Sequence, residues 1–285
     1  MSKKPSGETL SLASRVRTNQ GLDIPWLGLG VFQTPPGPPT RKAVACALET
    51  GYRLIDTASM YGNEEDVGVS VRASGIPREE IVVTTKLWHT DHGFEPAQAA
   101  ARKSLQRLGL DRIDLYLIHW PQAKSPEERL GSWRALEKLQ REGTCRAIGV
   151  SNYTVRHLEE LRKASDVIPA VNQVEFHPFV YDPALLRYCD QHGVRLEAWS
   201  PLTRGRHLDD AFVGAVAAET QRTPAQVLVR WGLQHGVVEL PKSVRDDRIR
   251  ENANVFDFAL SSDQMRRLDG LAGGGRVGWD PDAIP

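Results

Sequence analysis

Residues 113–119 read IDLYLIH, a short apolar run that ends in a histidine. Three other short apolar runs also end in a polar or ionisable residue, namely RLID at 53–56, IVVTTK at 81–86 and CRAIGVSN at 145–152. In an eightfold barrel of strands and helices, the loops that follow the strands build the active site. Polar endings on separate strands therefore predict a catalytic site at the C-terminal face of such a barrel.

Working outward from these runs, short apolar segments alternate along the chain with longer stretches of helical periodicity. We expect strands at 27–31, 53–56, 81–85, 113–118, 145–150, 170–174, 194–199 and 237–240. We expect the helices between them at 41–50, 64–73, 96–108, 126–141, 155–163, 183–192 and 224–234. Such regular alternation implies parallel strands with right-handed crossovers. The predicted fold is of the α/β class, a (β/α)8 TIM barrel.

Four segments outside this alternation have predictions of their own. Residues 14–26 read as a hairpin with an Asn-Gln-Gly turn, which we expect to form a lid on one end of the barrel. Extra helices are expected near the C-terminus, at 208–220 and at 262–270, where Ser261 and Gln264 have capping-box spacing. The Gly- and Pro-rich tail at 272–285 is expected to be a loop over a site, with a frayed terminus as the alternative.

Length and composition describe an ordinary globular chain. Its 285 residues fit one barrel domain, 1–285, and 36 basic residues balance 36 acidic ones, so nothing points to nucleic acid or to a membrane surface. The three cysteines are far apart and form no CxxC pair, which fits a reducing cytoplasm. The N-terminal MSKKP leads into no apolar stretch, so we expect no signal peptide. A monomer is the expected state.

Four ionisable residues at the predicted strand ends form a candidate acid-base cluster. Asp56, Lys86 and His119 each end an apolar run, and Tyr61 lies in the loop after Asp56. A tyrosine hydroxyl has a pKa of about 10 and is a poor proton shuttle at neutral pH, whereas a nearby ammonium stabilises the phenolate. At ~4 Å and an effective dielectric of ~20, that attraction is about 4 kcal/mol, or roughly three pKa units at most.

The other two members of the cluster support this pair. Lys86 would tend to lose its proton when buried, so it needs a carboxylate, which Asp56 can supply. His119 can donate a hydrogen bond from a neutral imidazole to a substrate carbonyl oxygen. Each residue alone also has a structural interpretation, as a turn aspartate, a packed tyrosine or a structural histidine. Together they predict protonation of an oxygen while another group attacks the carbon.

Two other kinds of site are considered and set aside. The segment GLGVFQ at 28–33 does not complete a GxGxxG fingerprint, which argues against a Rossmann domain. His89, Asp91 and His92 have the side chains of metal ligands but stand in a polar loop, and we expect no metal there.

At this point the chain resembles the aldo-keto reductase family, and in particular a bacterial branch that includes 2,5-diketo-D-gluconate reductases. The resemblance extends from about Gly28 to Arg276. It is carried, in order, by GYRLIDTASMYGNE, TTKLW, DLYLIHWP, IGVSN, VNQVEFHP, AWSPL and LPKSVR. It implies that Tyr61 is the proton donor, that Lys86 lowers its pKa, that Asp56 supports the lysine and that His119 orients the carbonyl.

The resemblance also implies a nicotinamide cofactor held along the rim of the barrel. The nicotinamide contacts fall on Ser151, Asn152 and Gln173, with Trp199 as the stacking ring, where many relatives have tyrosine. The phosphate and adenosine contacts fall on Ser200, Leu202, Arg204, Lys242, Ser243, Val244, Arg248, Glu251 and Asn252. Because Lys242 and Arg248 can neutralise an extra ribose phosphate, NADPH is expected rather than NADH. Without the resemblance, Lys242 would be interpreted as a solvated surface lysine and Arg248 as an arginine on a helix face.

The expected substrate pocket is aromatic. In the family arrangement, Phe32, Trp88, Trp120 and Trp279 would surround the substrate together with His119, although packing is the alternative role of these rings. The expected reaction is NADPH-dependent reduction of aldehydes or ketones, among them small carbonyls, α-dicarbonyls and keto-sugar acids. A cofactor-binding regulatory member of the same fold with little turnover is the alternative. A metal-dependent hydrolase would need a His and Asp cluster that the sequence lacks.

Overall fold

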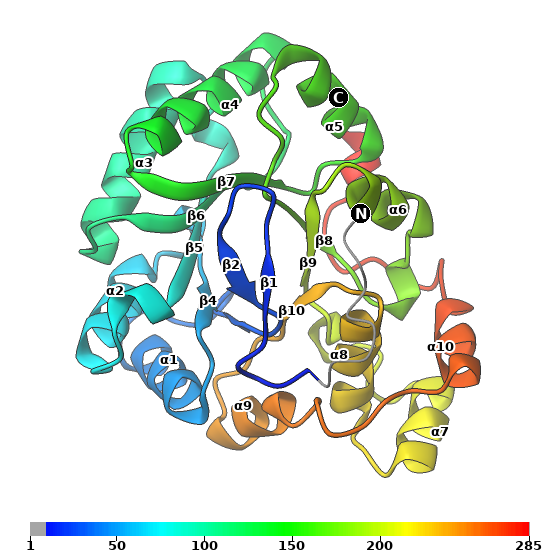
Figure 1. The fold of residues 1–285 in the computed structure, drawn as a ribbon. Helices are drawn as coiled ribbons and strands as arrows, with labels where there is room; N and C mark the ends of the chain where they lie inside the picture. Colours follow the sequence, from blue (N-terminus) through cyan, green and yellow to red (C-terminus); the bar gives the residue numbers. More distant parts are fainter. Residues whose placement is uncertain (1–9, 285) are drawn as a thin grey trace.

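The structure is a computed structural model that describes residues 10–284, and it contains a barrel of eight parallel strands surrounded by helices (Figure 1). The MSKKP segment used above in the signal-peptide prediction lies outside these residues. The strands follow one another around the barrel in chain order: β3 (Leu29–Gly30), β4 (Leu54–Asp56), β5 (Val82–Leu87), β6 (Ile113–Ile118), β7 (Cys145–Ser151), β8 (Val171–Glu175), β9 (Arg195–Trp199) and β10 (Val238–Leu240). The predicted fold class is confirmed.

The barrel closes between its first and last strands. The amide of Gly28 donates to the carbonyl oxygen of Glu239 at 2.9 Å, and the amide of Glu239 donates to Trp26 at 2.9 Å. Further along, Gly30 donates to Pro241 at 3.1 Å. β3 is shorter than the predicted 27–31, and this part of the chain meets the last strand only through isolated bridges, from Leu27 to Glu239 and from Gly30 to Lys242.

Helices cover the outside of the barrel. Seven connect successive strands: α1 (Pro38–Thr50), α2 (Glu64–Ala73), α3 (Phe94–Leu108), α4 (Pro126–Arg141), α5 (Val155–Ala164), α6 (Pro183–Gln191) and α8 (Pro224–Gln234). Three more lie in the C-terminal half: α7 (Ala211–Thr220), α9 (Asp246–Ala253) and α10 (Ser262–Asp269). The predicted cap at Thr223 and the capping box at Ser261 are both formed. α9 was not predicted, because only two of its residues are buried and Ile249 and Ala253 are its only apolar residues.

A hairpin covers the end of the barrel where the strands begin, as expected. It is formed by β1 (Arg15–Arg17) and β2 (Asp23–Pro25), and Figure 1 looks onto it. The side chain of Gln20 accepts from the amide of Ile148 at 2.9 Å and donates to the carbonyl of Ile168 at 2.7 Å. The hairpin is therefore bonded to the barrel wall, and the opposite end is left for the site.

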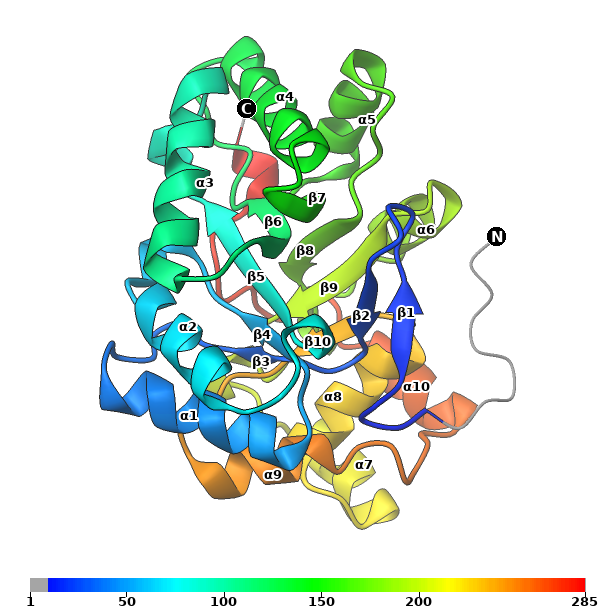
Figure 2. The same cartoon turned by 60° about the vertical axis from the view of Figure 1, so that its left-hand side comes forward.

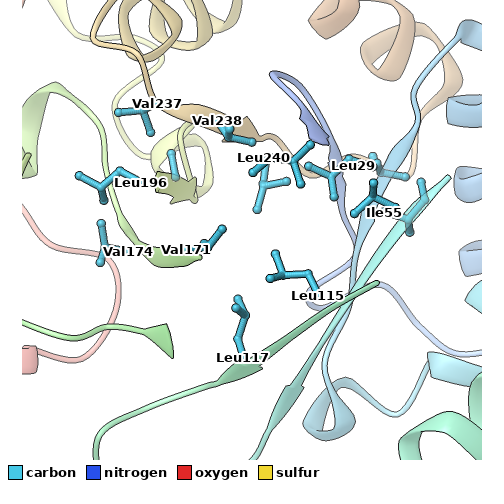
Figure 3. Packing of buried hydrophobic residues seen from close by; sticks show 14 of the residues in the cluster. Leu29, Ile55, Leu115, Leu117, Val171, Val174, Leu196, Val237, Val238 and Leu240 are labelled. Carbon is cyan, nitrogen blue, oxygen red and sulfur yellow. The ribbon is translucent and has the colours of Figure 1, made fainter. Parts of the chain in front are cut away.

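The interior of the barrel is apolar below its C-terminal rim. Figure 3 shows side chains from different strands packed together, including Leu29, Ile55, Leu115 and Leu196, each 3% exposed or less. Burial of a leucine or isoleucine side chain contributes about 1.5–3 kcal/mol. This layer fixes the strand ends that carry the polar residues. No helix within residues 10–284 is long and apolar enough to cross a membrane.

Candidate active site

The residues predicted from the strand ends converge on one cavity of about 770 Å³. Asp56 ends β4, His119 follows β6, Asn152 follows β7, and Trp199 ends β9. All four line the cavity, and so do Tyr61 and Gln173. Lys86, near the end of β5, lies behind this surface and is fully buried.

Lys86 and Asp56 form a buried ion pair. The ammonium Nζ lies 2.7 Å from Asp56 Oδ1 and donates a second hydrogen bond to the carbonyl of Thr57 at 2.9 Å. Burial lowers the pKa of Lys86, but the carboxylate of Asp56 and the phenol of Tyr61 more than offset this and leave it above its usual value. The lysine therefore stays charged inside the barrel, as the sequence predicts.

Tyr61 lies beside this pair, in the single turn of 3-10 helix Ser59–Tyr61 after β4. Nζ of Lys86 is 5.2 Å from the centre of its ring. Burial raises the pKa of Tyr61, and the ammonium of Lys86 lowers it by less, so the net pKa lies above its usual value. The lowering expected from Lys86 is present, but burial has the stronger effect and reverses the net direction. The phenol keeps its proton and faces a cation that would stabilise its phenolate.

His119 completes the cluster as a neutral group. Burial, followed by the charge of Lys86, holds its pKa well below the usual range. Its ring is 5.7 Å from that of Tyr61, edge to face, and 5.1 Å from that of Trp88. Within residues 10–284, its Nδ1 is buried without a hydrogen-bond partner. A neutral imidazole on the cavity wall can donate one hydrogen bond without carrying a charge.

Side-chain amides next to the cluster are held by a hydrogen-bond network. Asn152 donates to the carbonyl of His119 at 2.8 Å and accepts from the indole of Trp199 at 2.8 Å. Ser151 donates to the carbonyl of Gln173 at 2.6 Å and is fully buried, so it supports this network from below. The structure therefore brings Asn152, Gln173 and Trp199 onto the cavity but not the predicted Ser151.

Gln173 joins two acidic residues. Its Nε2 donates to Asp56 Oδ2 at 2.7 Å and to Glu197 Oε2 at 3.0 Å, which leaves its carbonyl oxygen as the polar atom for a ligand. Burial raises the pKa of Glu197 to about 7. Sequence reasoning missed Glu197, although an acid inside the apolar run RLEAW was a visible signal.

Cationic side chains also line the cavity. Lys242 and Arg248 line it together with the predicted Ser200, Leu202, Arg204, Ser243, Glu251 and Asn252. Within residues 10–284, neither Lys242 nor Arg248 is in an ion pair. Burial without a partner lowers the pKa of Lys242. Val244 is exposed and does not line the cavity.

Backbone strain is concentrated around this cavity. Gln33, Asn152, Ser200 and Arg204 all have φ between 53° and 62°, a left-handed conformation that costs a residue other than glycine about 1–3 kcal/mol. All four line the cavity, which is typical of functional sites. Gln33 was not predicted as a site residue.

Aromatic rings form the wall around the catalytic cluster. Phe32 lies 5.0 Å from Tyr61, and Trp120 lies 5.2 Å from Trp279, measured between ring centres. The tail that carries Trp279 is ordered across the site, as the first of its two interpretations predicts. Met60, Val277 and Gly278 also line the cavity and were not predicted.

The loop with possible metal ligands has a structural role at His92. Its two ring nitrogens lie 2.8 Å from the hydroxyl of Ser132 and 3.0 Å from the carbonyl of Trp120. These contacts fix the backbone next to the aromatic wall. No group of three or more candidate ligands for a metal occurs between residues 10 and 284.

Comparisons with known proteins show which family the chain is similar to. A family model described as Aldo/keto reductase family matches residues 27–272. Glyoxal reductase of Bacillus subtilis is 48% identical over 96% of this chain and 98% of its own, and morphine 6-dehydrogenase of Pseudomonas putida is 46% identical over 93% and 94%. A mutant of Gox0644, solved in complex with NADPH, superposes with a TM-score of 0.89 at 39% identity, over 95% of this chain and 98% of that one.

The family model covers most of the chain, and the curated relatives cover nearly all of it. The names of these two relatives differ in substrate, although their identities to this chain are nearly equal. The chain belongs to the aldo/keto reductase family.

Proposed function

We propose that this chain reduces aldehydes or ketones to alcohols, with NADPH as the hydride donor and Tyr61 as the proton donor. The observation that carries the proposal is one continuous cavity. It is lined by Tyr61 and His119 and also by Lys242 and Arg248, two cations without an ion-pair partner among residues 10–284. Such a cavity fits an extended dinucleotide, and Gln173 keeps an acceptor for its carboxamide. The family and the NADPH complex of Gox0644 support this cofactor.

Each residue of the catalytic cluster would have its own role in the reaction. NADPH, when bound, would supply a hydride to the carbonyl carbon. His119, held neutral by burial, donates a hydrogen bond to the carbonyl oxygen and orients it. Tyr61 protonates that oxygen as negative charge develops on it. The phenolate that remains is stabilised by Lys86, which Asp56 keeps charged. The aromatic wall excludes water and so strengthens these interactions.

We infer a broad class of substrates: small aldehydes and ketones, α-dicarbonyls and keto-sugar acids. α-Dicarbonyls are favoured within it, because a relative with 48% identity is named glyoxal reductase. The three cysteines are free and buried, which supports a cytoplasmic setting, and we propose that the chain acts as a monomer.

A panel of carbonyl compounds tests the proposal. We expect loss of NADPH absorbance with several compounds and weaker turnover with NADH. In stopped-flow experiments, bound NADPH should be oxidised on mixing with glyoxal. NADPH that binds but is never oxidised by any compound of the panel would instead favour the regulatory alternative.

A further inference from the structure

The C-terminal strap, which we define as Arg276–Trp279, crosses the cavity near the catalytic cluster. The ring of Trp279 lies 5.2 Å from that of Trp120 and 6.2 Å from that of Trp88, yet 54% of Trp279 is exposed. Figure 2 draws this red segment on the far side of the barrel from the hairpin. A half-exposed ring cannot hold a chain segment in place by its own burial. Other contacts must therefore fix the strap.

Those contacts come from Glu175, the last residue of β8. Its Oε1 accepts from the amide of Val277 at 2.6 Å, and its Oε2 accepts from the amide of Gly278 at 3.0 Å. His177 lies 3.0 Å from Oε1, and Arg276 lies 3.9 Å from Oε2. The side chain of Glu175 is fully buried. Both carboxylate oxygens of Glu175 thus accept hydrogen bonds from the strap, and neither has a part in the proposed reaction.

The charge on this carboxylate strengthens the contacts. Burial raises the pKa of Glu175, but the hydrogen bonds from His177 and from the two strap amides outweigh it and leave the pKa below its usual value. An ionised acceptor makes hydrogen bonds about twice as strong as a neutral one. The ionised carboxylate of Glu175 therefore holds the strap in place.

The strap also contacts Trp199, the ring that is proposed to stack on the nicotinamide. A Cβ added to Gly278 would lie 2.3 Å from Cη2 of Trp199, so only glycine fits against this ring. Glu175 is two residues beyond Gln173 and hence on the same face of β8. The carboxylate of Glu175 thus joins β8, the strand that carries Gln173, to the strap. The strap in turn contacts Trp199 and carries Trp279.

We propose that Glu175 is a positioning residue, which latches the C-terminal strap over the cavity so that Trp279 forms the substrate wall. This inference rests on the proposed carbonyl reductase function. We expect the latch to act on substrate binding more than on chemistry, because the ring of Trp279 lies beside Trp88 and Trp120 of the proposed substrate wall.

Glu175→Gln tests the latch, since the amide keeps the shape and loses the charge. We expect the KM for glyoxal to rise about tenfold. We expect kcat and the Kd for NADPH to change less than about threefold. Hydrogen exchange at the amides of Val277 and Gly278 should accelerate by a similar factor of about ten.

The matched control is Asp114→Asn. Asp114 is also fully buried, accepts from the amide of Val83 at 3.0 Å and pairs with Arg146 at 3.2 Å, but at the opposite end of the barrel. We expect this variant to lose stability while the KM and the strap amides remain as in the wild type. A KM rise of equal size in Asp114→Asn would overturn the proposal.

Two further variants keep the inference testable if Glu175→Gln does not fold. Gly278→Ala retains the carboxylate but forces the strap off Trp199, and we expect the same rise in KM. In a Trp279→Ala background, Glu175→Gln should raise KM less than twofold, because the wall that it positions is gone. Additive effects, or strap amides that stay protected in Glu175→Gln, would overturn the latch. If the wild type reduces no carbonyl, the proposed function fails, while hydrogen exchange still decides the latch.

Discussion

At the scale of single residues, the catalytic proposal depends on Tyr61 keeping its proton until it is needed. Burial outweighs Lys86 in setting its pKa, so the phenol is uncharged at neutral pH. A proton donor needs this state before reaction and a stabilised anion after it. Lys86, 5.2 Å from the ring, provides the second requirement.

Tyr61→Phe removes the transferable proton and keeps the ring that packs on Phe32. General acid catalysis contributes about 10²–10⁴-fold, so we expect kcat for carbonyl reduction to fall about 10³-fold. NADPH binding, followed by fluorescence titration, should stay within about twofold of the wild type. A variant that keeps more than about a tenth of its turnover would refute the assigned role.

A separate prediction concerns Lys242 and Arg248, the two cavity cations that make no ion pair within residues 10–284. Replacing Lys242 and Arg248 by methionine should weaken NADPH binding by at least about tenfold, because charge-assisted bonds to the ribose phosphate are lost. The affinity for NADH, which lacks that phosphate, should change less than about threefold. Lys103→Met, at an exposed position of α3, is the control and should alter neither. Equal losses for the two cofactors would argue against a phosphate site.

Glu197 predicts a pH dependence of stability. Its pKa of about 7 in the folded state lies above the unfolded value of about 4.5. The stability it contributes is therefore fully present below pH 4.5 and is lost as pH rises toward 7. Glu197→Gln cannot ionise and can still accept from Gln173. By urea unfolding, we expect this variant to gain on the wild type by up to about 3 kcal/mol near pH 8 and to match it near pH 4.5. A difference in the free energy of unfolding between the variant and the wild type that does not change with pH would contradict this prediction.

At the scale of elements, β10 and α8 fit together around a buried acid. Glu239 of β10 is fully buried, and neither oxygen has a partner between residues 10 and 284. A Cβ on Gly232 of α8 would lie 1.7 Å from its Oε1, so the helix can pack here only with glycine. Burial raises the pKa of Glu239 well above its usual value.

This contact predicts a reversal of sign between two backgrounds. Gly232→Ala alone should lower the free energy of unfolding by about 1–3 kcal/mol through overpacking. In a Glu239→Ala background the same change should raise it by up to about 1 kcal/mol, since alanine favours helix over glycine. Urea unfolding of the four proteins gives the comparison. Destabilisation of the same size in both backgrounds would show that the carboxyl is not the obstacle.

The helices and strands also show which signals in the sequence were sufficient to predict the bounds of an element. Helices with local start signals, such as α8 with Thr223 and Pro224, were located closely because the caps lie within the segment itself. The unpredicted α9 has no side-chain cap and begins with two aspartates. The short β3 pairs with β4 on one side and meets residues more than 200 positions away on the other only through isolated bridges, which no local pattern encodes.

At the scale of the whole molecule, the catalytic cluster was predictable because parallel strands bring their ends to one rim. Asp56, Lys86 and His119 could therefore be placed together from their positions in three strands. The roles of the interior acids could not be predicted: Glu197 stands out as an acid inside the apolar run RLEAW, but the partners of Glu175 and Glu197 lie on other elements and are known only from the fold. The contact from Glu175 to the strap spans 102 residues, and only the closed barrel brings the two together.

The hairpin across the end where the strands begin has a practical consequence for handling the molecule. All three cysteines are buried, and the side chain of Arg17 in β1 is 67% exposed. A single cysteine introduced as Arg17→Cys would offer an accessible thiol for tethering to an electrode or resin. Molecules attached in this way would share one orientation, with their openings directed into the flowing solution.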